Sequence, residues 1–222
     1  MGNKMIAPGV FDFNPDVPEQ IDDLERLEIL ARLSRLPIES RRTERFFNFE
    51  DIEGRKEGLE ACFQLIRGEI QPPMLMLYGL PGRSKSRLAK ATAWSFIGQL
   101  KSACYYQVGD LLDDLRSGMR IQKSLQPGEF VPDSSDAILN FVKRCSLLVL
   151  DDLGVHNETD WAVEKLDTIV NHRYENALAT IITANSLEIS DRIYDRMCQG
   201  RVVMLKGPSY RQLIMERRKV DG

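Results

Sequence analysis

The sequence predicts an α/β fold in which a parallel β-sheet lies between two layers of helices. Short apolar segments alternate with helical patterns from residue 46 onward, as in folds where each strand is followed by a helix that packs on the sheet. Residues 147–150 are all apolar, which is typical of a strand buried on both faces. Strands are expected at residues 74–78, 103–108, 147–151, 180–184 and 202–205. We therefore expect a three-layer αβα sandwich around a five-stranded parallel sheet.

Helical patterns precede and separate these strands. Residues 21–36 have acidic side chains first and basic ones last, the order that the helix macrodipole favours, and Pro37 is expected to end this helix. Its apolar residues recur every third position and form no single stripe, so it either contacts different neighbours along its length or consists of two short pieces. Two clear stripes follow, at Ala89, Ala93, Phe96, Ile97 and Leu100, and at Ala162, Leu166, Ile169 and Val170, the second with Thr159 as its N-cap. Residues 121–136 are expected to form a long exposed loop.

The composition is that of a globular protein. The 222 residues are 43% hydrophobic and 28% charged, with 30 Lys and Arg against 33 Asp and Glu, a net charge of −3. These values exclude a disordered chain, a collagen-like repeat and a generally polybasic nucleic-acid binder. No apolar stretch reaches the roughly 18 residues of a membrane span, so we expect a cytoplasmic protein without membrane contact. The cysteines are far apart, which predicts buried thiols; they are Cys62, Cys104, Cys145 and Cys198.

A glycine-rich segment directly follows the first expected strand. Residues 79–86 read Gly-Leu-Pro-Gly-Arg-Ser-Lys-Ser and precede a helix, which is the context of a phosphate-binding P-loop. In such a loop, backbone N–H groups and the helix N-terminus surround the phosphates, Lys85 neutralises the β- and γ-phosphates, and the Ser86 hydroxyl binds Mg²⁺. The sequence therefore predicts an ATP and Mg²⁺ site. Its expected nucleotide-binding residues are Gly79, Leu80, Pro81, Gly82, Arg83, Ser84, Lys85, Ser86 and Arg87.

One position departs from the P-loop pattern. Ser84 stands where the pattern G-x-x-x-x-G-K-[ST] has its second glycine, which allows the closest backbone approach to phosphate. We expect ATP binding to be retained, because serine is small and keeps its own N–H group. The alternative is a decayed loop that binds nucleotide weakly or not at all.

Polar side chains follow the third and fourth expected strands. Asp151 and Asp152 lie at the carboxyl end of the third strand, where open α/β sheets bind their ligands. Asp151 is expected to bind Mg²⁺ through water, and Asp152 to polarise the water that attacks the γ-phosphate. Asn185 follows the fourth strand and could orient that water. Without the P-loop, the two aspartates would read as helix-capping residues and Asn185 as a turn residue.

In combination, these motifs resemble the AAA+ ATPases of bacterial helicase loaders of the DnaC and DnaI type, with IstB-like transposase helpers as close relatives. The resemblance rests on the P-loop, on Leu-Leu-Val-Leu-Asp-Asp-Leu-Gly at 147–154, and on residues 46–50, 158–161, 171–176, 180–185 and 207–211. It implies an ATPase domain at residues 45–222, without a C-terminal lid domain, preceded by a leader and short helical extension at residues 1–44. This extension is shorter than the helicase-binding region of full loaders.

The resemblance also implies roles for individual residues. Asn185 matches sensor 1, and Arg196 matches the arginine finger, which reaches the γ-phosphate of a neighbouring subunit; Arg192 is the second candidate. Arg211 is a candidate second phosphate sensor. A planar cation suits this task because it stabilises charge spread over the transferring phosphoryl group. A finger supplied by a neighbour requires a head-to-tail homo-oligomer, a ring or spiral. Without the family resemblance, each arginine would be interpreted as a charged side chain exposed to solvent.

The expected partners are a replicative helicase and single-stranded DNA, bound without sequence specificity. Basic side chains for DNA are Arg116, Arg120 and Lys123, with Arg217, Arg218 and Lys219 near the C-terminus; binding by phosphate neutralisation would depend steeply on salt. The alternative for these residues is a solvated helix end. The 21–36 helix either docks a partner or packs on its own chain. Two other functions remain open: a transposition helper ATPase with a transposase partner, and a non-hydrolysing nucleotide-binding adapter.

Overall fold

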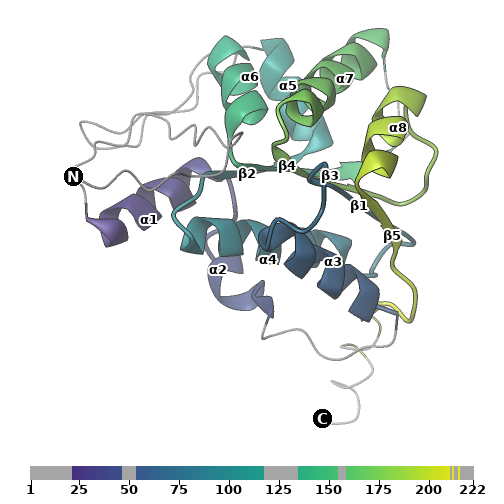
Figure 1. The fold of residues 1–222 in the computed structure, drawn as a ribbon, viewed down its shortest axis with the longest axis horizontal. Coiled ribbons are helices and arrows are strands. Elements are labelled where there is room, and N and C mark those ends of the chain that lie inside the picture. Colours follow the sequence, from purple (N-terminus) through teal and green to yellow (C-terminus); the bar gives the residue numbers. More distant parts are fainter. Residues whose placement is uncertain are drawn as a thin grey trace.

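The computed structural model describes residues 22–46, 54–117, 135–154 and 159–210, together with residues 212 and 215. Five strands form one parallel sheet in the order β2-β3-β4-β1-β5 (Figure 1). They are β1 (Met74–Tyr78), β2 (Ala103–Gln107), β3 (Leu147–Leu153), β4 (Ala179–Ala184) and β5 (Arg201–Met204). Every predicted strand is present, and its ends lie within two residues of the predicted positions.

Helices cover both faces of the sheet, which confirms the predicted three-layer sandwich (Figure 1). One layer contains α1 (Asp23–Leu33), α2 (Ser40–Thr43), α3 (Lys56–Ile66) and α4 (Lys85–Gly98). The other contains α5 (Val108–Ser117), α6 (Ser135–Arg144), α7 (Asp160–Glu175) and α8 (Asp191–Gln199). The predicted loop at 121–136 lies outside the described residues up to position 134, and its last two residues are helical because they begin α6.

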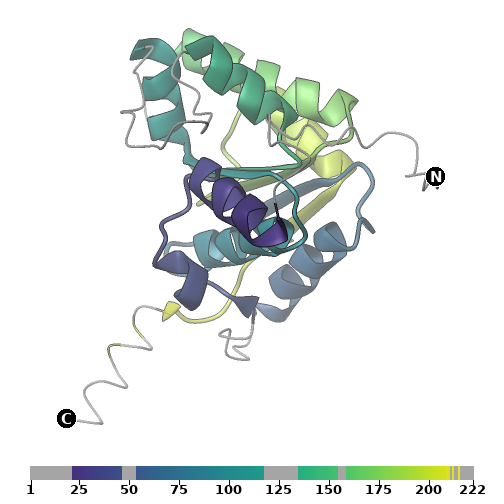
Figure 2. The ribbon, with the colours of Figure 1, turned by 90° about the vertical axis from the view of Figure 1, so that its left-hand side faces the viewer.

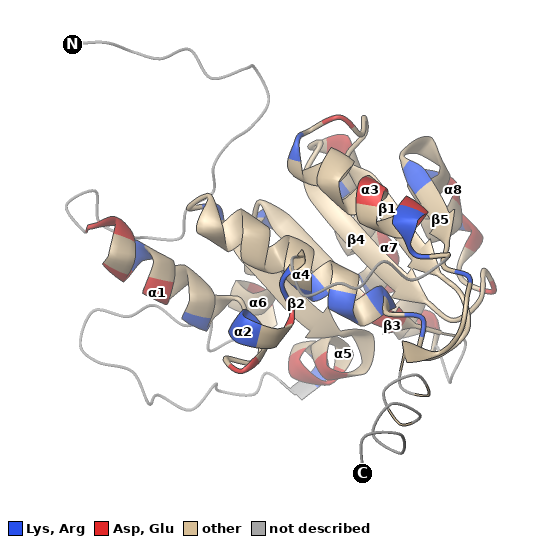
Figure 3. Ribbon diagram, turned by 90° about the horizontal axis from the view of Figure 1, so that it is seen from below, with Lys and Arg blue, Asp and Glu red and all other residues tan. Residues whose placement is uncertain are grey.

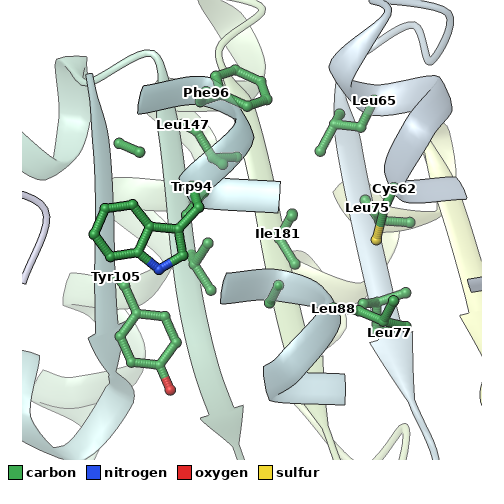
Figure 4. Packing of buried hydrophobic residues seen from close by; sticks show 14 of the residues in the cluster. Cys62, Leu65, Leu75, Leu77, Leu88, Trp94, Phe96, Tyr105, Leu147 and Ile181 are labelled. Atoms are coloured by element: carbon green, nitrogen blue, oxygen red, sulfur yellow. The ribbon is translucent and has the colours of Figure 1, made fainter. Parts of the chain in front are cut away.

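Successive side chains of the central strand β1 are buried on opposite faces of the sheet. Leu75 and Leu77 belong to the cluster that includes Leu88 of α4, whereas Met74 and Met76 belong to the cluster under α5–α8. Figure 4 shows the first of these clusters, with α3 and α4 side chains packed against the strands. Because strand residues alternate between faces, a sheet covered on both sides requires apolar residues at every position. Each such side chain contributes about 1.5–3 kcal/mol by burial.

The N-terminal helix α1 is one continuous helix that contacts different neighbours along its length. Leu27, Leu30 and Ala31 pack with the cluster around α4, whereas Leu33 packs with the cluster on the other face of the sheet. The first of the two alternatives for this helix is therefore confirmed. Figure 2 shows α1 lying across the edge of the sheet, so this helix packs on its own chain.

The end of α1 differs from the prediction. The helix ends at Leu33, before Pro37, because the carbonyl of Ser34 accepts the N–H of Tyr105 at 2.8 Å and so pairs with the edge of the sheet. Arg35 then adopts a left-handed conformation with φ 58°. The competing contact with β2 ends the helix earlier than proline would.

Other details confirm or correct the sequence analysis. Thr159 caps α7 as predicted, accepting the N–H of Ala162 at 3.3 Å. Leu100 is wrongly placed in the helical stripe, since α4 ends at Gly98. The four cysteines are free; three are buried as predicted, but Cys198 is exposed on α8. In the described part of the chain, no helix has the length and apolar character needed to cross a membrane.

Candidate functional site

The glycine-rich segment 79–84 connects β1 to α4 at the carboxyl end of the sheet. Because α4 begins at Lys85, the loop amides and the first turn of the helix are adjacent. Gly79 and Gly82 have φ values of 137° and 81°, in the region that favours glycine. The structure thus has the strand, turn and helix that the P-loop motif requires.

Residues 205–210 pack directly on this loop. A Cβ atom on Gly79 would lie 2.6 Å from the carbonyl oxygen of Leu205, and one on Gly82 would lie 2.3 Å from Ser209 Oγ. The backbone N–H of Tyr210 donates to the carbonyl oxygen of Gly82 at 2.9 Å. Gly79 is therefore required by the close approach of the Leu205 backbone as well as by its own conformation, whereas Gly82 is required mainly by its positive φ.

Ser84 adopts the backbone conformation that the missing glycine would favour. Its φ of 69° and ψ of 18° are left-handed, a conformation that costs a residue with a Cβ about 1–2 kcal/mol. The residue is only 8% exposed, and its hydroxyl oxygen has no hydrogen-bond partner among the described residues. The loop therefore keeps its shape at the cost of local strain and an unpaired hydroxyl.

The ammonium group of Lys85 is held by three oxygen atoms. Its Nζ donates to the carbonyl oxygens of Gly79 at 2.7 Å and Leu80 at 3.2 Å, and to Asn185 Oδ1 at 2.9 Å. Asn185 Nδ2 in turn donates to Asp152 Oδ1 at 3.0 Å. One amide thus links the lysine of the loop to the acidic end of β3, and three predicted site residues form one hydrogen-bonded chain.

Asp151 is buried and its carboxylate is held from two sides. Thr183 Oγ1 donates to Oδ1 at 2.6 Å, and the Tyr105 hydroxyl donates to Oδ2. Thr183 Oγ1 also accepts the backbone N–H of Asp152 at 2.9 Å, next to a left-handed φ of 59° at Asp152. Burial and the Asp151 carboxylate raise the pKa of Tyr105, so its hydroxyl stays a proton donor.

Tyr105 and Thr183 are site residues that the sequence did not predict. Thr183 lies in the segment that carries Asn185. Its hydroxyl, among the apolar residues of β4, is a feature that could have identified it as a site residue. Tyr105 gave no local signal, because its contact with Asp151 arises from the pairing of β2 with β3.

A pocket of 490 Å³ lies beside the loop and the start of α4. Four cationic side chains line it, from Arg83, Lys85, Arg87 and Lys90, and Ser86 lines it as well. Among the described lining residues, Glu44 is the one carboxylate. Figure 3 shows basic residues along this part of α4. The excess of positive charge favours a polyanion such as a triphosphate.

Two segments distant in sequence close the side of this pocket. Arg87 Nε forms an ion pair with Glu44 Oε2 at 3.1 Å, and its guanidinium lies 4.2 Å from the centroid of the Tyr210 ring. The Arg55 guanidinium lies 5.1 Å from the same ring. Glu44 belongs to the segment predicted as an N-terminal extension, so that extension contributes to the pocket. Glu44 and Tyr210 were not predicted as pocket residues, because only the fold brings them to α4.

The predicted arginine finger lies in a different pocket. Arg196 of α8 lines a cavity of 410 Å³ formed with residues of α6 and α7, and this cavity shares no lining residue with the pocket beside the P-loop. Its Nε donates to Asn171 Oδ1 at 2.6 Å. Arg192 lines the same cavity, with its side chain 80% exposed and Nη1 3.9 Å from Asp167 Oδ2.

Part of the predicted DNA surface is described. Arg116 is exposed near the end of α5, and its guanidinium lies 5.0 Å from the centroid of the Trp161 ring at the start of α7. Trp161 was not predicted as part of this surface, because it follows a different strand from Arg116. Arg211, Arg120, Lys123 and residues 217–219 lie outside the described residues, and their roles stay predictions.

The donor set fits a magnesium ion that is bound mainly through phosphate and water. In the described residues, no group of three or more His, Cys, Asp or Glu is placed to hold a metal ion by itself. Mg²⁺ typically takes one or two protein oxygens and completes its shell with substrate phosphates and water. Each Asp151 carboxylate oxygen accepts one hydrogen bond, from Tyr105 or from Thr183, and a carboxylate oxygen has two lone pairs, so each can accept another from a metal-bound water.

Comparison with known proteins agrees with this architecture. The model of the family described as IstB-like ATP binding protein matches residues 19–217. The uncharacterized protein YqaM of Bacillus subtilis (strain 168) is 27% identical over 159 residues, covering 65% of this chain and 46% of that protein. The replicative helicase loader DnaC of Escherichia coli (strain K12) is 26% identical over 175 residues, covering 74% and 67%. The chain thus spans about half to two thirds of the length of these curated relatives.

Among solved structures, the crystal structure of the DnaC helicase loader superimposes with a TM-score of 0.56 at 22% identity, covering 75% of this chain and 98% of that one. This likeness confirms the predicted α/β fold with its five-stranded parallel sheet. The family match begins before α1 and extends beyond β5, so it includes all the strands and helices described above. On this ground, the chain belongs to the family of IstB-like ATP-binding proteins.

Proposed function

We propose that the protein is an ATP-hydrolysing helicase loader of the DnaC and DnaI type. The observation that carries this proposal is the hydrogen-bonded chain from Lys85 through Asn185 to Asp152. It joins the lysine of the phosphate loop to the carboxylate expected to polarise water, through an amide that can orient that water. Residues whose only role was to cap a helix or form a turn would have no reason to be hydrogen-bonded to one another at the ends of three neighbouring strands.

ATP binding would replace the present contacts of Lys85. Its ammonium group now donates to two backbone carbonyls and one amide oxygen. Phosphate oxygens are charged acceptors and make shorter, stronger hydrogen bonds with ammonium than neutral oxygens do. Transfer of Lys85 to the β- and γ-phosphates would free Asn185 Oδ1 to accept a hydrogen bond from the attacking water. Asp152 would then accept a proton from that water.

The Ser86 hydroxyl and Asp151 would hold Mg²⁺, with Asp151 acting through water. The ion would neutralise charge on the β- and γ-phosphates. The hydroxyls of Thr183 and Tyr105 fix the carboxylate of Asp151 in place, so it would not need to reorganise when the metal arrives. Arg211 would contact a phosphate from the segment that follows Tyr210.

Arg196 would act on the nucleotide of a neighbouring subunit. Its cavity and the pocket beside the P-loop have no lining residue in common, which supports contact between subunits rather than within one. A head-to-tail homo-oligomer would place one such cavity against the next P-loop pocket. Hydrolysis would then be slow until subunits assemble, because the cation that stabilises the transition state comes from the neighbour.

Single-stranded DNA would contact the surface at Arg116 and Trp161. An exposed guanidinium beside an aromatic ring offers both a phosphate contact and a face on which a base can stack. Neither group reads a base sequence, so binding would be non-specific. The replicative helicase is proposed as the partner because the chain is similar to a replicative helicase loader over most of its length.

The test combines nucleotide binding, turnover and helicase loading. Wild-type protein should bind ATP in calorimetry, hydrolyse it faster with single-stranded DNA, and increase the amount of its host's replicative helicase bound to that DNA. Lys85→Ala should lose all three activities. Lys101→Ala is the matched control, because Lys101 lies beyond the far end of α4, with its Nζ 5.6 Å from the Phe96 ring.

Each contrary outcome has a distinct meaning. Absence of ATP binding by the wild-type protein would refute the site. ATP binding without turnover, unchanged by DNA or helicase, would favour the adapter. Capture of a transposase instead of the helicase would favour the transposition helper.

A further inference from the structure

The guanidinium of Arg196 is held in place by its own subunit. Nε donates to Asn171 Oδ1 at 2.6 Å, and Nη1 donates to the carbonyl oxygen of Arg192 at 3.0 Å. The Arg196 backbone is fixed as well, because Ile193 and Met197 of the same helix are buried beneath it. These contacts use Nε and Nη1, and Nη2 makes no hydrogen bond with the described residues.

Asn171 is itself oriented by a further hydrogen bond. Its Nδ2 donates to Glu175 Oε1 at 2.7 Å, one turn along α7. This bond fixes which end of the amide faces Arg196, so the oxygen is presented to the guanidinium. The ring of Tyr174 lies beneath, with its centroid 6.0 Å from Arg196 Cζ. One turn of α7 and the preceding turn of α8 therefore position this cation.

The side chain that orients Arg196 is a neutral amide, so it does not neutralise the charge of the guanidinium. An amide oxygen orients a guanidinium without neutralising it, whereas a carboxylate partner would form an ion pair and reduce the attraction for a third anion. The nearby carboxylate of Asp167 is engaged elsewhere: it accepts a hydrogen bond from Ser190 Oγ at 3.0 Å and lies 3.9 Å from Arg192 Nη1. Glu175 also lines the cavity, but its carboxylate accepts the hydrogen bond from Asn171, and Arg196 forms no ion pair with the described residues.

We propose that Asn171 is a positioning residue for Arg196, which holds the guanidinium ready to meet the γ-phosphate of a neighbouring subunit. This proposal rests on the trans site of the proposed function. An arginine side chain loses much rotamer freedom when it is fixed, and a finger that is already ordered before assembly loses less on reaching the phosphate. Removal of the amide should lower turnover about five- to tenfold, the effect of one orienting hydrogen bond.

The experiment assigns the two roles to different chains. Lys85→Ala protein cannot bind ATP but supplies Arg196, and Arg196→Ala protein binds ATP but supplies no finger. A mixture of the two should hydrolyse ATP in the presence of single-stranded DNA. Asn171→Ala is then added to the chain that supplies the finger, and turnover should fall while the half-saturating ATP concentration stays the same, because the ATP pocket belongs to the other chain.

Two further variants separate positioning from general damage. Asn171→Ala placed in the Arg196→Ala chain has no guanidinium to orient, so no additional loss is expected there. Asn176→Ala in the finger-supplying chain is the matched control, since Asn176 follows the same helix but donates to the carbonyl oxygen of His172 at 2.7 Å. All variants should unfold at the same temperature as their parents.

The outcomes distinguish this proposal from the function on which it rests. If a mixture of the Lys85→Ala and Arg196→Ala chains does not restore turnover, the trans site is refuted, and the role proposed for Asn171 is refuted as well. If they restore turnover but Asn171→Ala has the same effect in either chain, or none, only the positioning role is overturned. A rise in turnover would also overturn it, because Asn171 would then restrain the finger.

Discussion

Lys85 and Asn185 share a hydrogen bond of 2.9 Å although 100 residues separate them in the sequence. The sheet order explains the contact, because β4 lies between β1 and β3 and its carboxyl end meets both of theirs. The amide that follows β4 therefore lies between the lysine after β1 and the Asp152 carboxylate at the end of β3. The site is assembled by strand order.

Replacement of Asn185 by alanine should separate ATP binding from turnover. The loop amides and Lys85 remain, so the dissociation constant for ATP should change by less than about threefold. Turnover should fall by about 10–100-fold, because the water would lose the group proposed to orient it. Calorimetry and steady-state hydrolysis measure the two effects. Unchanged turnover would show that Asn185 is only a structural link between Lys85 and Asp152.

Asp152→Asn should keep ATP binding but lose hydrolysis. The amide retains the size of the side chain and can still bond to Asn185, yet it cannot accept a proton from water at neutral pH. A decrease of at least about 100-fold in turnover is expected. Rapid-quench measurement of a single turnover checks this result, and turnover equal to that of the wild-type protein would refute the role assigned to Asp152.

Ser84→Gly should stabilise the protein. Glycine adopts the observed φ of 69° without strain and removes an unpaired buried hydroxyl, so the free energy of unfolding should rise by about 1 kcal/mol. Ser84→Ala is the informative control, because it removes the hydroxyl but keeps the strained Cβ. Urea unfolding should rank the glycine variant above the alanine variant; the reverse order would contradict backbone strain as the cause. ATP affinity should rise with the glycine variant.

Thr183→Val should destabilise the fold and impair hydrolysis. Valine has the same shape, but the Asp151 carboxylate loses a buried donor and the Asp152 N–H loses its acceptor in a partly buried setting. The expected cost is about 2–3 kcal/mol in the free energy of unfolding. Thr168→Val, on the exposed face of α7, is the matched control and should change it by less than about 0.5 kcal/mol. Equal stabilities would contradict the bridging role.

Trp161→Ala and Arg116→Ala should weaken single-stranded DNA binding in different ways. Loss of a stacking ring should reduce affinity about tenfold, with little change in salt dependence. Loss of the arginine should lower the slope of log affinity against log salt by about 0.7, the value for one phosphate contact. Fluorescence anisotropy with a labelled oligonucleotide measures both. Identical effects of the two variants at all salt concentrations would argue against a mixed stacking and phosphate surface.

Local patterns in the chain sufficed to predict the five strands and the phosphate loop. A strand buried on both faces must be apolar at every position, and a glycine-rich turn before Lys85 has few uses other than phosphate binding. The polar residues that follow β3 and β4 could be predicted for the same reason, since parallel strands present their carboxyl ends at one edge. These features depend on residues that are close together in the sequence.

Other parts of the site depend on contacts that no local pattern records. Tyr105 reaches Asp151 only because β2 pairs with β3, and Glu44 reaches Arg87 only because the segment before the sheet folds back on α4. The end of α1 was mispredicted for the same reason, since pairing of Ser34 with Tyr105 overrides the helix signal that Pro37 gives.

The chain thus specifies by itself which segments are strands and helices and which of them carry phosphate chemistry, because these properties follow from side-chain periodicity and local backbone geometry. Tertiary structure decides how the polar groups connect: the amide of Asn185 between Lys85 and Asp152, the hydroxyls on Asp151, and Arg196 in a cavity separate from the P-loop. The physical reason is that hydrogen bonds act over about 3 Å, and only strand order and helix packing bring residues so distant in sequence within that range.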